Sequence, residues 1–237
     1  MIDSYLKFSP DLIIEATSVC DRICPGCYAP NVVSKESAEK LLLEKPELFI
    51  DQKTLLELFS NLFSDEKPKL GLVSIRGGEP TRHPHLASIV EVASKFSENV
   101  FIETHGRWIL KPEAFNQSLL EVCKMTGATI KLSFDKMHGG DSMPLQEITD
   151  YLEKNNINFI IAITEHTESE FFMSRTLCGW IPDKNIIFQK KSRSADDLIK
   201  PTIGVVKVNG TFSQSLNSRI SFQSPANSAR NSSEVVA

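Results

Sequence analysis

The sequence has no apolar run that is long enough to cross a membrane. Its uninterrupted apolar stretches are short, as at Phe159–Ile163, whereas a spanning helix needs about 20 residues. The first residues, MIDSYLKFSPDLIIE, lack the charged start and the apolar stretch of a secretory signal. These absences predict a cytoplasmic protein without a membrane partner.

The sequence also lacks a strong excess of charge of either sign. Charged residues make up 24% of the chain, and the net charge is −4. Such a balance creates no overall field that would attract nucleic acid or an anionic membrane surface, so nucleic acid is not an expected partner. With 237 residues and 41% hydrophobic content, the chain can bury a sizeable core, and a single domain is the default expectation.

Cysteine is scarce, with five residues in the whole chain, and a disulfide framework is therefore not expected. Three of the five fall close together, at Cys20, Cys24 and Cys27. Clustered thiols in a reducing compartment indicate metal ligands or redox groups. Cys123 and Cys178 stand alone, and two distant thiols are too few to hold a second iron–sulfur cluster. Cys123 is expected in the core.

Apolar runs with the length of β-strands recur along the chain and are rich in β-branched and aromatic residues. The six runs are Leu12–Ala16, Leu70–Ile75, Val100–Thr104, Thr129–Phe134, Asn158–Ile163 and Asn185–Phe188. Patterns with helical spacing lie between them. They cover residues 51–63, 85–96, 112–125, 144–155 and 168–177. The nearly continuous hydrophobicity of the runs predicts strands that are buried on both faces of a parallel sheet.

The spacing of the runs favours repeated βαβ units. Their ends at residues 75, 104, 134, 163 and 188 are separated by 29, 30, 29 and 25 residues, close to the roughly 30 residues of one unit. This predicts an α/β fold, either an incomplete barrel or an open doubly wound sheet. A hairpin around Asn209-Gly210 is expected next. Residues 1–222 would form the core domain with this extension, and residues 223–237 a disordered tail.

The strongest chemical signal is the segment CDRICPGC, directly after the first predicted strand. It places Cys20, Cys24 and Cys27 in a Cys-x3-Cys-x2-Cys pattern, in a loop rich in turn-forming residues. Thiolates that are close in sequence on a loop can wrap one face of a metal cluster. Three thiolates cannot complete the coordination of zinc or of a cubane cluster, so one metal position would stay open for a ligand.

A second motif, RGGEPTRHP, follows the second predicted strand. Its two glycines, Gly77 and Gly78, would let the backbone approach a ligand closely, because they have no side chain. Glu79 could accept a charge-assisted hydrogen bond from a cationic ammonium group.

Together the two motifs resemble those of the radical S-adenosylmethionine superfamily. The resemblance implies a partial (β/α)6 TIM-like barrel with a short C-terminal β extension. It also implies that Cys20, Cys24 and Cys27 hold a [4Fe–4S] cluster whose open iron binds S-adenosylmethionine. Reductive cleavage of that cofactor would give methionine and a 5′-deoxyadenosyl radical that abstracts hydrogen from a substrate. An external reductant such as flavodoxin or ferredoxin is implied as well.

The resemblance also implies which residues contact the cofactor. The segment that matches the family's GGEP motif would bind the methionyl amine, and polar residues at later strand ends would meet the carboxylate and the ribose. The family usually has an aromatic residue just before the third cysteine, whereas this chain has Gly26 there and Tyr28 just after it. The implied cofactor-binding residues are Gly77, Gly78, Glu79, Pro80, Thr104, Ser133, Gly26 and Tyr28.

Two polar residues of the segment SFDKMHGGD are candidate catalytic residues. Asp135 and His138 follow the fourth predicted strand, at the carboxyl rim where barrel enzymes place their active sites. A tight turn could bring both side chains to one pocket, and a carboxylate beside a histidine suits proton delivery. We expect them to contact the substrate or to donate a proton. Thr104, His105 and Gly106 end the third strand at the same rim, whereas His83 is expected to be structural or solvated.

The expected substrate is a small molecule or a cofactor precursor, because the chain is short and has no cysteines for an auxiliary cluster. Two alternatives fit the same residues. An activase that installs a glycyl radical on a partner enzyme would also be short and hold one cluster, and its substrate would be a protein. The other alternative is a non-enzymatic iron–sulfur or zinc-binding protein, since clustered thiols also form zinc sites and redox pairs.

Overall fold

The computed structural model describes residues 8–24, 27, 32–62, 69–135, 138, 143–165, 167–190 and 204–214. The predicted tail at residues 223–237 and the candidate residues Gly26 and Tyr28 lie outside these ranges. In the part of the chain that is described, no helix is both long enough and apolar enough to span a membrane.

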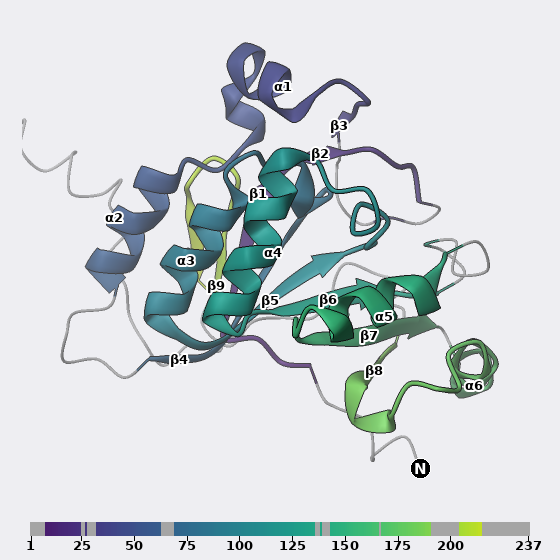
Figure 1. The fold of residues 1–237 in the computed structure, drawn as a ribbon. Helices are drawn as coiled ribbons and strands as arrows, with labels where there is room; N and C mark the ends of the chain where they lie inside the picture. The colour runs from purple at the N-terminus through teal and green to yellow at the C-terminus, as the bar shows by residue number, and fades with distance from the viewer. Residues whose placement is uncertain are drawn as a thin grey trace, which may run out of the picture.

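The main sheet has eight strands in the order β10-β9-β1-β4-β5-β6-β7-β8 (Figure 1). Their bounds are β1 Leu12–Thr17, β4 Leu70–Gly77, β5 Ser97–Thr104, β6 Thr129–Ser133, β7 Phe159–Glu165, β8 Ile186–Lys190, β9 Gly204–Val206 and β10 Phe212–Gln214. Neighbours are parallel except β9 and β10, which are antiparallel. This confirms the predicted α/β fold and the hairpin, and the described strands do not close into a barrel.

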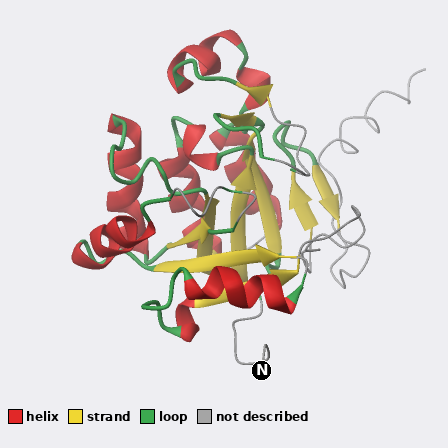
Figure 2. Ribbon diagram, turned by 90° about the vertical axis from the view of Figure 1, so that its right-hand side faces the viewer, coloured by secondary structure: helices red, strands yellow, loops and turns green. Residues whose placement is uncertain are grey.

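The five helices that the sequence predicts are present. They are α2 Gln52–Leu62, α3 Leu86–Phe96, α4 Ala114–Thr126, α5 Leu145–Lys154 and α6 Glu168–Thr176. Figure 1 shows α2, α3 and α4 side by side over one face of the sheet. Figure 2 shows the strands turning from nearly vertical to nearly horizontal across the sheet, the twist that successive strands normally accumulate.

Several short elements between β1 and α2 and at later loops were not predicted. They are β2 Val19–Cys20, β3 Val32–Val33, α1 Ala38–Glu44 and the 3-10 turns η2 Pro46–Leu48, η3 Pro80–Arg82 and η5 Asp183–Asn185. The strands β2 and β3 pair with each other in a separate two-stranded sheet. Val19, Leu41 and Phe49 form a small apolar cluster that packs α1 against β2. This packing supports the segment that carries Cys20.

Most strand residues are buried on both faces of the sheet, as the sequence predicts, but the second face also carries polar side chains. Alternate residues such as Ile14, Ile75 and Leu132 belong to the main hydrophobic core. Side chains alternate along a strand, so the residues between these face the other side of the sheet. They include Glu103 and Lys131, whose carboxylate and ammonium groups lie 2.8 Å apart. Both polar positions lie within runs that are otherwise largely apolar.

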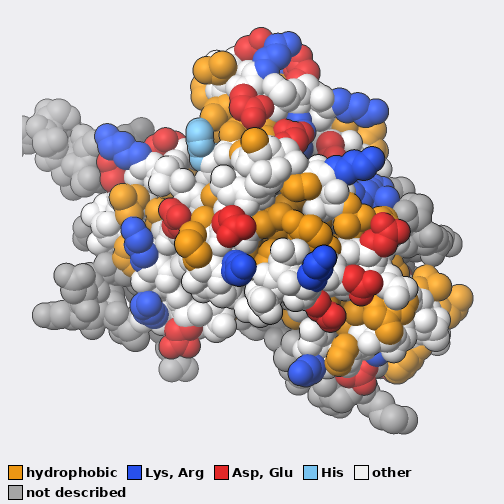
Figure 3. All heavy atoms as spheres, in the orientation of Figure 1, with side chains coloured by type: hydrophobic (Ala, Val, Ile, Leu, Met, Phe, Trp, Pro, Cys, Tyr) orange, Lys and Arg blue, Asp and Glu red, His pale blue; other side chains and the backbone are white. Residues whose placement is uncertain are grey.

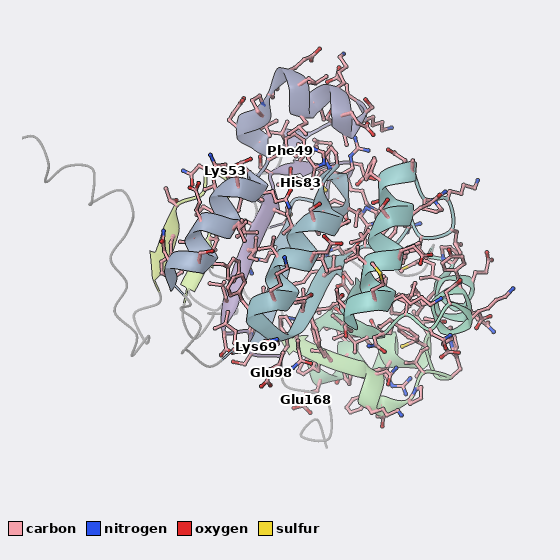
Figure 4. All side chains as sticks on the ribbon, turned by 60° about the vertical axis from the view of Figure 1, so that its left-hand side comes forward. Phe49, Lys53, Lys69, His83, Glu98 and Glu168 are labelled. Carbon is pink, nitrogen blue, oxygen red and sulfur yellow. The ribbon has the colours of Figure 1, made fainter. Side chains whose placement is uncertain are left out.

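Cys123, which was expected in the core, and His83, which was expected to be structural or solvated, are both buried. Cys123 is 1% exposed and belongs to the main core. His83 is 1% exposed, with Nε2 2.9 Å from the Ile50 carbonyl oxygen and Nδ1 accepting a hydrogen bond from the His85 amide. Its ring packs edge-on against Phe49, and both residues lie at the end of the molecule next to α1 (Figure 4).

The outer surface seen in Figure 3 carries interspersed acidic and basic side chains.

Candidate cofactor site at the carboxyl edge of the sheet

The two motif loops meet at the carboxyl edge of the sheet. The strands that precede them, β1 and β4, pair in parallel. Beyond their ends, the Gly78 amide donates to the Thr17 carbonyl oxygen at 2.7 Å, and the Glu79 amide donates to the Val19 carbonyl oxygen at 2.8 Å. The segment that leads to Cys20 is thereby held against the loop that carries Glu79.

The two glycines of the second motif make this contact sterically feasible. A Cβ atom on Gly77, whose φ is +153°, would lie 2.2 Å from the Thr17 carbonyl oxygen, and a Cβ atom on Gly78 would lie 2.2 Å from that of Val19. Side chains are excluded at both positions by the neighbouring backbone. The glycines were expected to admit a ligand, and the structure shows that they admit the preceding strand. Pro80 follows them, buried, as the first residue of η3.

The three clustered cysteines differ in exposure. Cys20 is 7% exposed at the end of β2, Cys24 is half-buried and Cys27 is exposed. Burial raises the pKa of Cys20 to about 11, and it also raises the pKa of Cys24. The neighbouring thiols add to both shifts, Cys24 acting on Cys20 and Cys27 acting on Cys24. The thiols of Cys20 and Cys24 are therefore protonated at neutral pH.

The cysteine thiols are suitable metal ligands, but they are not arranged around a metal site. Within the described residues, no group of three or more His, Cys, Asp or Glu side chains is arranged to hold a metal ion. The three thiols nevertheless share one loop, and the Cys27 amide donates to the Cys24 carbonyl oxygen at 3.1 Å. Thiolate is the usual ligand of iron–sulfur clusters, so the loop carries donors of the right chemistry.

Glu79 is a buried carboxylate that accepts hydrogen bonds on both of its oxygens. It is 2% exposed. Its Oε1 atom accepts hydrogen bonds from the Thr81 amide at 3.2 Å, the Thr81 hydroxyl at 2.7 Å and the Thr104 hydroxyl at 2.7 Å. Its Oε2 atom accepts one from the His105 amide at 3.1 Å. A carboxylate can be buried at tolerable cost only when it is hydrogen-bonded in this way, so the orientation of Glu79 is built into the fold.

Of the two later strand-end residues expected to meet the cofactor, the structure brings one to Glu79. Thr104 is 2% exposed. Its hydroxyl donates to Glu79 and accepts from the Gly106 amide at 3.1 Å and the Trp108 indole at 2.9 Å. These three bonds use the full capacity of a hydroxyl, so Thr104 orients Glu79. Ser133 lies two strands away at the end of β6 and is partly exposed.

His105, a strand-end candidate without an assigned role, and Asp21, which the sequence did not single out, lie beside Glu79. His105 Nε2 lies 3.1 Å from Asp21 Oδ1 and 3.3 Å from Glu79 Oε2. Burial by itself would lower the pKa of His105, but Glu79 and Asp21 beside the ring outweigh it and raise the pKa above its ordinary value. In the sequence, the position of His105 at the end of a predicted strand indicates that it could lie at the site. For Asp21, the only such indication is that it follows Cys20.

Asp135 and His138 form the pair that the sequence predicts. His138 Nδ1 lies 2.9 Å and 2.8 Å from the two carboxylate oxygens of Asp135, and the His138 amide donates to Oδ1 at 2.9 Å. Asp135 is 1% exposed. Its charge contributes to the raised pKa of Cys24, so the pair lies near the cysteine loop. The structure thus confirms that a tight turn joins the two side chains.

No family model matches this chain, and no curated protein matches it. Among solved structures it is similar to SuiB of Streptococcus suis, in a crystal structure bound to S-adenosylmethionine, with 14% identity and a TM-score of 0.46. The match covers 93% of this chain and 64% of that one, so this chain spans less than two thirds of its length. A likeness at this level decides neither fold family nor function.

The site therefore combines three chemically distinct parts at one edge of the sheet. Three thiols lie on the loop after β2, a fixed carboxylate lies on the loop after β4, and an acid–base pair follows β6. Ligands of α/β proteins commonly bind at this edge of a sheet.

Proposed function

We propose that the protein is a radical S-adenosylmethionine enzyme that acts on a small molecule or a cofactor precursor. In this proposal, Cys20, Cys24 and Cys27 hold a [4Fe–4S] cluster, and the cofactor binds beside Glu79. The supporting observation is the backbone contact between the two motif loops, through Gly78 with Thr17 and Glu79 with Val19. It brings residues that are far apart in the sequence to the two sides of one site.

The cysteine loop would bind the cluster by releasing protons. The pKa of Cys20 is about 11 because the thiol is buried, so it binds a metal only as the metal displaces its proton. Metal binding commonly couples to deprotonation and to local ordering of the ligand loop. Three thiolates leave one iron without a protein ligand, and Glu79 lies on the neighbouring loop, where it could accept hydrogen bonds from an ammonium group of the incoming cofactor.

The bound cluster and S-adenosylmethionine would supply the radical chemistry: one electron breaks a carbon–sulfur bond and gives methionine and a 5′-deoxyadenosyl radical. The protein binds and orients the reactants and excludes water. Thr81, Thr104 and His105 already fix the Glu79 side chain through hydrogen bonds. Glu79 would therefore lose little conformational entropy when a ligand binds. An external one-electron donor such as flavodoxin or ferredoxin completes the proposal.

Asp135 and His138 would serve the substrate. Asp135 is an acceptor when ionised, so the His138 nitrogen that faces it, Nδ1, carries a proton. The other ring nitrogen is left to exchange a proton with a ligand. The His138 side chain is 23% exposed, and a ligand can therefore reach it. This pair would donate or accept a proton as the substrate radical is formed or quenched.

The proposal can be tested on protein reconstituted with iron and sulfide without oxygen. We expect about four irons per chain, and 5′-deoxyadenosine on addition of dithionite and S-adenosylmethionine. The variants Cys20→Ala, Cys24→Ala and Cys27→Ala should each lose the iron chromophore. Cys123→Ala and Cys178→Ala are the matched controls and should keep it, because both thiols are buried away from the loop. Iron binding that requires Cys123 or Cys178, or reduced protein that never cleaves the cofactor, would contradict the proposal.

A further inference from the structure

We infer that His105 is a positioning residue that fastens the cysteine loop to Glu79. The inference rests on the proposed function for its purpose, since it holds the two halves of the proposed cofactor site together. His105 follows the end of β5, and the two groups that it contacts lie on the loops after β2 and β4. Three segments of the chain are therefore joined through one imidazole ring.

The geometry assigns the contact to one nitrogen of the ring. Nε2 lies 3.1 Å from Asp21 Oδ1 and 3.3 Å from Glu79 Oε2. Nδ1, on the other side of the ring, accepts a hydrogen bond from the Arg107 amide at 3.2 Å. An accepting Nδ1 carries no proton, so the proton of the neutral ring is on Nε2 and points towards the two carboxylates. The backbone at Arg107 thus selects the tautomer that the contact needs.

The contact does not depend on the charge of the ring. Asp21 and Glu79 favour the protonated imidazole, whereas the cation of Arg22 and the Arg107 amide oppose it. Both forms carry a hydrogen on Nε2, so either can donate to the carboxylates. The ring is 8% exposed, and a hydrogen bond between a buried donor and a charged acceptor is among the stronger ones in proteins.

The two carboxylates respond differently when this donor is removed. Glu79 keeps its bonds to the Thr81 and Thr104 hydroxyls, so the loop after β4 stays in place. Asp21 is held by the His105 ring across 84 positions of sequence. Without the ring, Asp21 would lose its side-chain hydrogen bond, and its charge would face that of Glu79 without the imidazole between them. The segment beyond Cys20 would then be held only through its backbone bonds, from Glu79 to Val19 and from Ser34 to Cys20, and Cys20 would be exposed to solvent more often.

This can be measured on the metal-free protein, without oxygen, by the rate at which a maleimide alkylates each cysteine, followed by mass spectrometry. In the wild type, Cys20 should react slowly and the exposed Cys27 rapidly. His105→Ala should speed alkylation of Cys20 by about tenfold, the effect of losing one hydrogen bond to a charged group. Cys123 and Cys178, in the core, should not change and report on the fold.

Two matched variants separate the nitrogen contact from the bulk of the ring. A glutamine amide nitrogen reaches about as far as Nε2, whereas an asparagine amide falls short of it. His105→Gln should therefore restore slow alkylation of Cys20, and His105→Asn should behave like His105→Ala. Asp21→Ala should resemble His105→Ala, and the double variant should be no faster, because both changes remove the same contact.

Several outcomes would overturn the inference. Alkylation of Cys20 that stays slow in His105→Ala would show that the ring does not hold the loop. A rise at Cys123 and Cys178 as large as that at Cys20 would show a general loosening of the fold. A glutamine variant as reactive as the alanine variant would remove the role of the Nε2 donor. None of these results depends on a cluster or on S-adenosylmethionine, so each is distinguishable from a failure of the proposed function.

Discussion

A methyl group on Gly78 would come within 2.2 Å of the Val19 carbonyl oxygen. The neighbour is backbone, which cannot rotate away as a side chain can. At the same place, hydrogen bonds join Gly78 to Thr17 and Glu79 to Val19. The absence of a side chain at residue 78 is therefore what allows the two motif loops to come together.

Gly78→Ala should consequently destabilise the protein. Forcing extra atoms into a packed region typically costs about 1–3 kcal/mol, and the strain would fall on the segment that leads to Cys20. Urea denaturation of the metal-free protein measures the free energy of unfolding. Gly179→Ala is the matched control, because its Cβ would meet the Thr176 carbonyl oxygen at 3.5 Å, an ordinary contact. Equal stability of the two variants would show that the loops are not packed as described.

Glu79→Gln should weaken the binding of S-adenosylmethionine. The change removes the charge but keeps an acceptor for Thr81 and Thr104, whereas alanine would leave these donors unsatisfied. A hydrogen bond to a charged group is worth roughly 1.5–3 kcal/mol, so affinity should fall by about tenfold or more. Isothermal titration of the cluster-loaded protein gives the measurement, with Glu91→Gln, on the exposed surface of α3, as the control. Unchanged affinity in Glu79→Gln would remove Glu79 from the ligand contacts.

Asp135→Asn and His138→Gln should separate cofactor cleavage from substrate chemistry. Neither residue belongs to the cysteine motif, so both variants should keep the cluster and the slow formation of 5′-deoxyadenosine without substrate. Each should lose the acceleration that substrate causes, because proton transfer typically contributes about 10²–10⁴-fold. The assay compares product formation with and without a small-molecule fraction from cells. Asp150→Asn, exposed on α5, is the control, and acceleration that persists in both site variants would exclude the pair.

His83 should make the protein sensitive to mild acid. Burial lowers the pKa of His83 from 6.5 to about 4, so the folded state favours the neutral ring. Its contribution to stability is complete above pH 6.5 and is lost as the pH falls towards 4, by up to about 3 kcal/mol. Urea denaturation at pH 7.5 and 4.5 measures this loss. His83→Gln does not titrate and should lose less stability on acidification, and an equal loss in both proteins would assign the effect to other groups.

The sequence by itself determined the features that depend on neighbours along the chain. The apolar runs predicted β1 and the five strands β4 to β8. The helical spacing between the runs predicted α2 to α6. Asp135 and His138 could be paired because a turn of three residues suffices to join them. The short helix α1 was missed because its seven residues carry too few periodic positions to stand out, and its stability comes from packing on Val19 and Phe49.

Only the tertiary structure decided which distant groups share the site. Asp21 and His105 are 84 positions apart, and no local pattern links them. They meet because parallel pairing of β1 with β4 and of β4 with β5 brings three strand ends to one edge. The same pairing assigns Gly77 and Gly78 to a backbone contact and turns the Thr104 hydroxyl towards Glu79. Strand register is a property of the assembled sheet, which is why these roles could not be derived from spacing in the sequence.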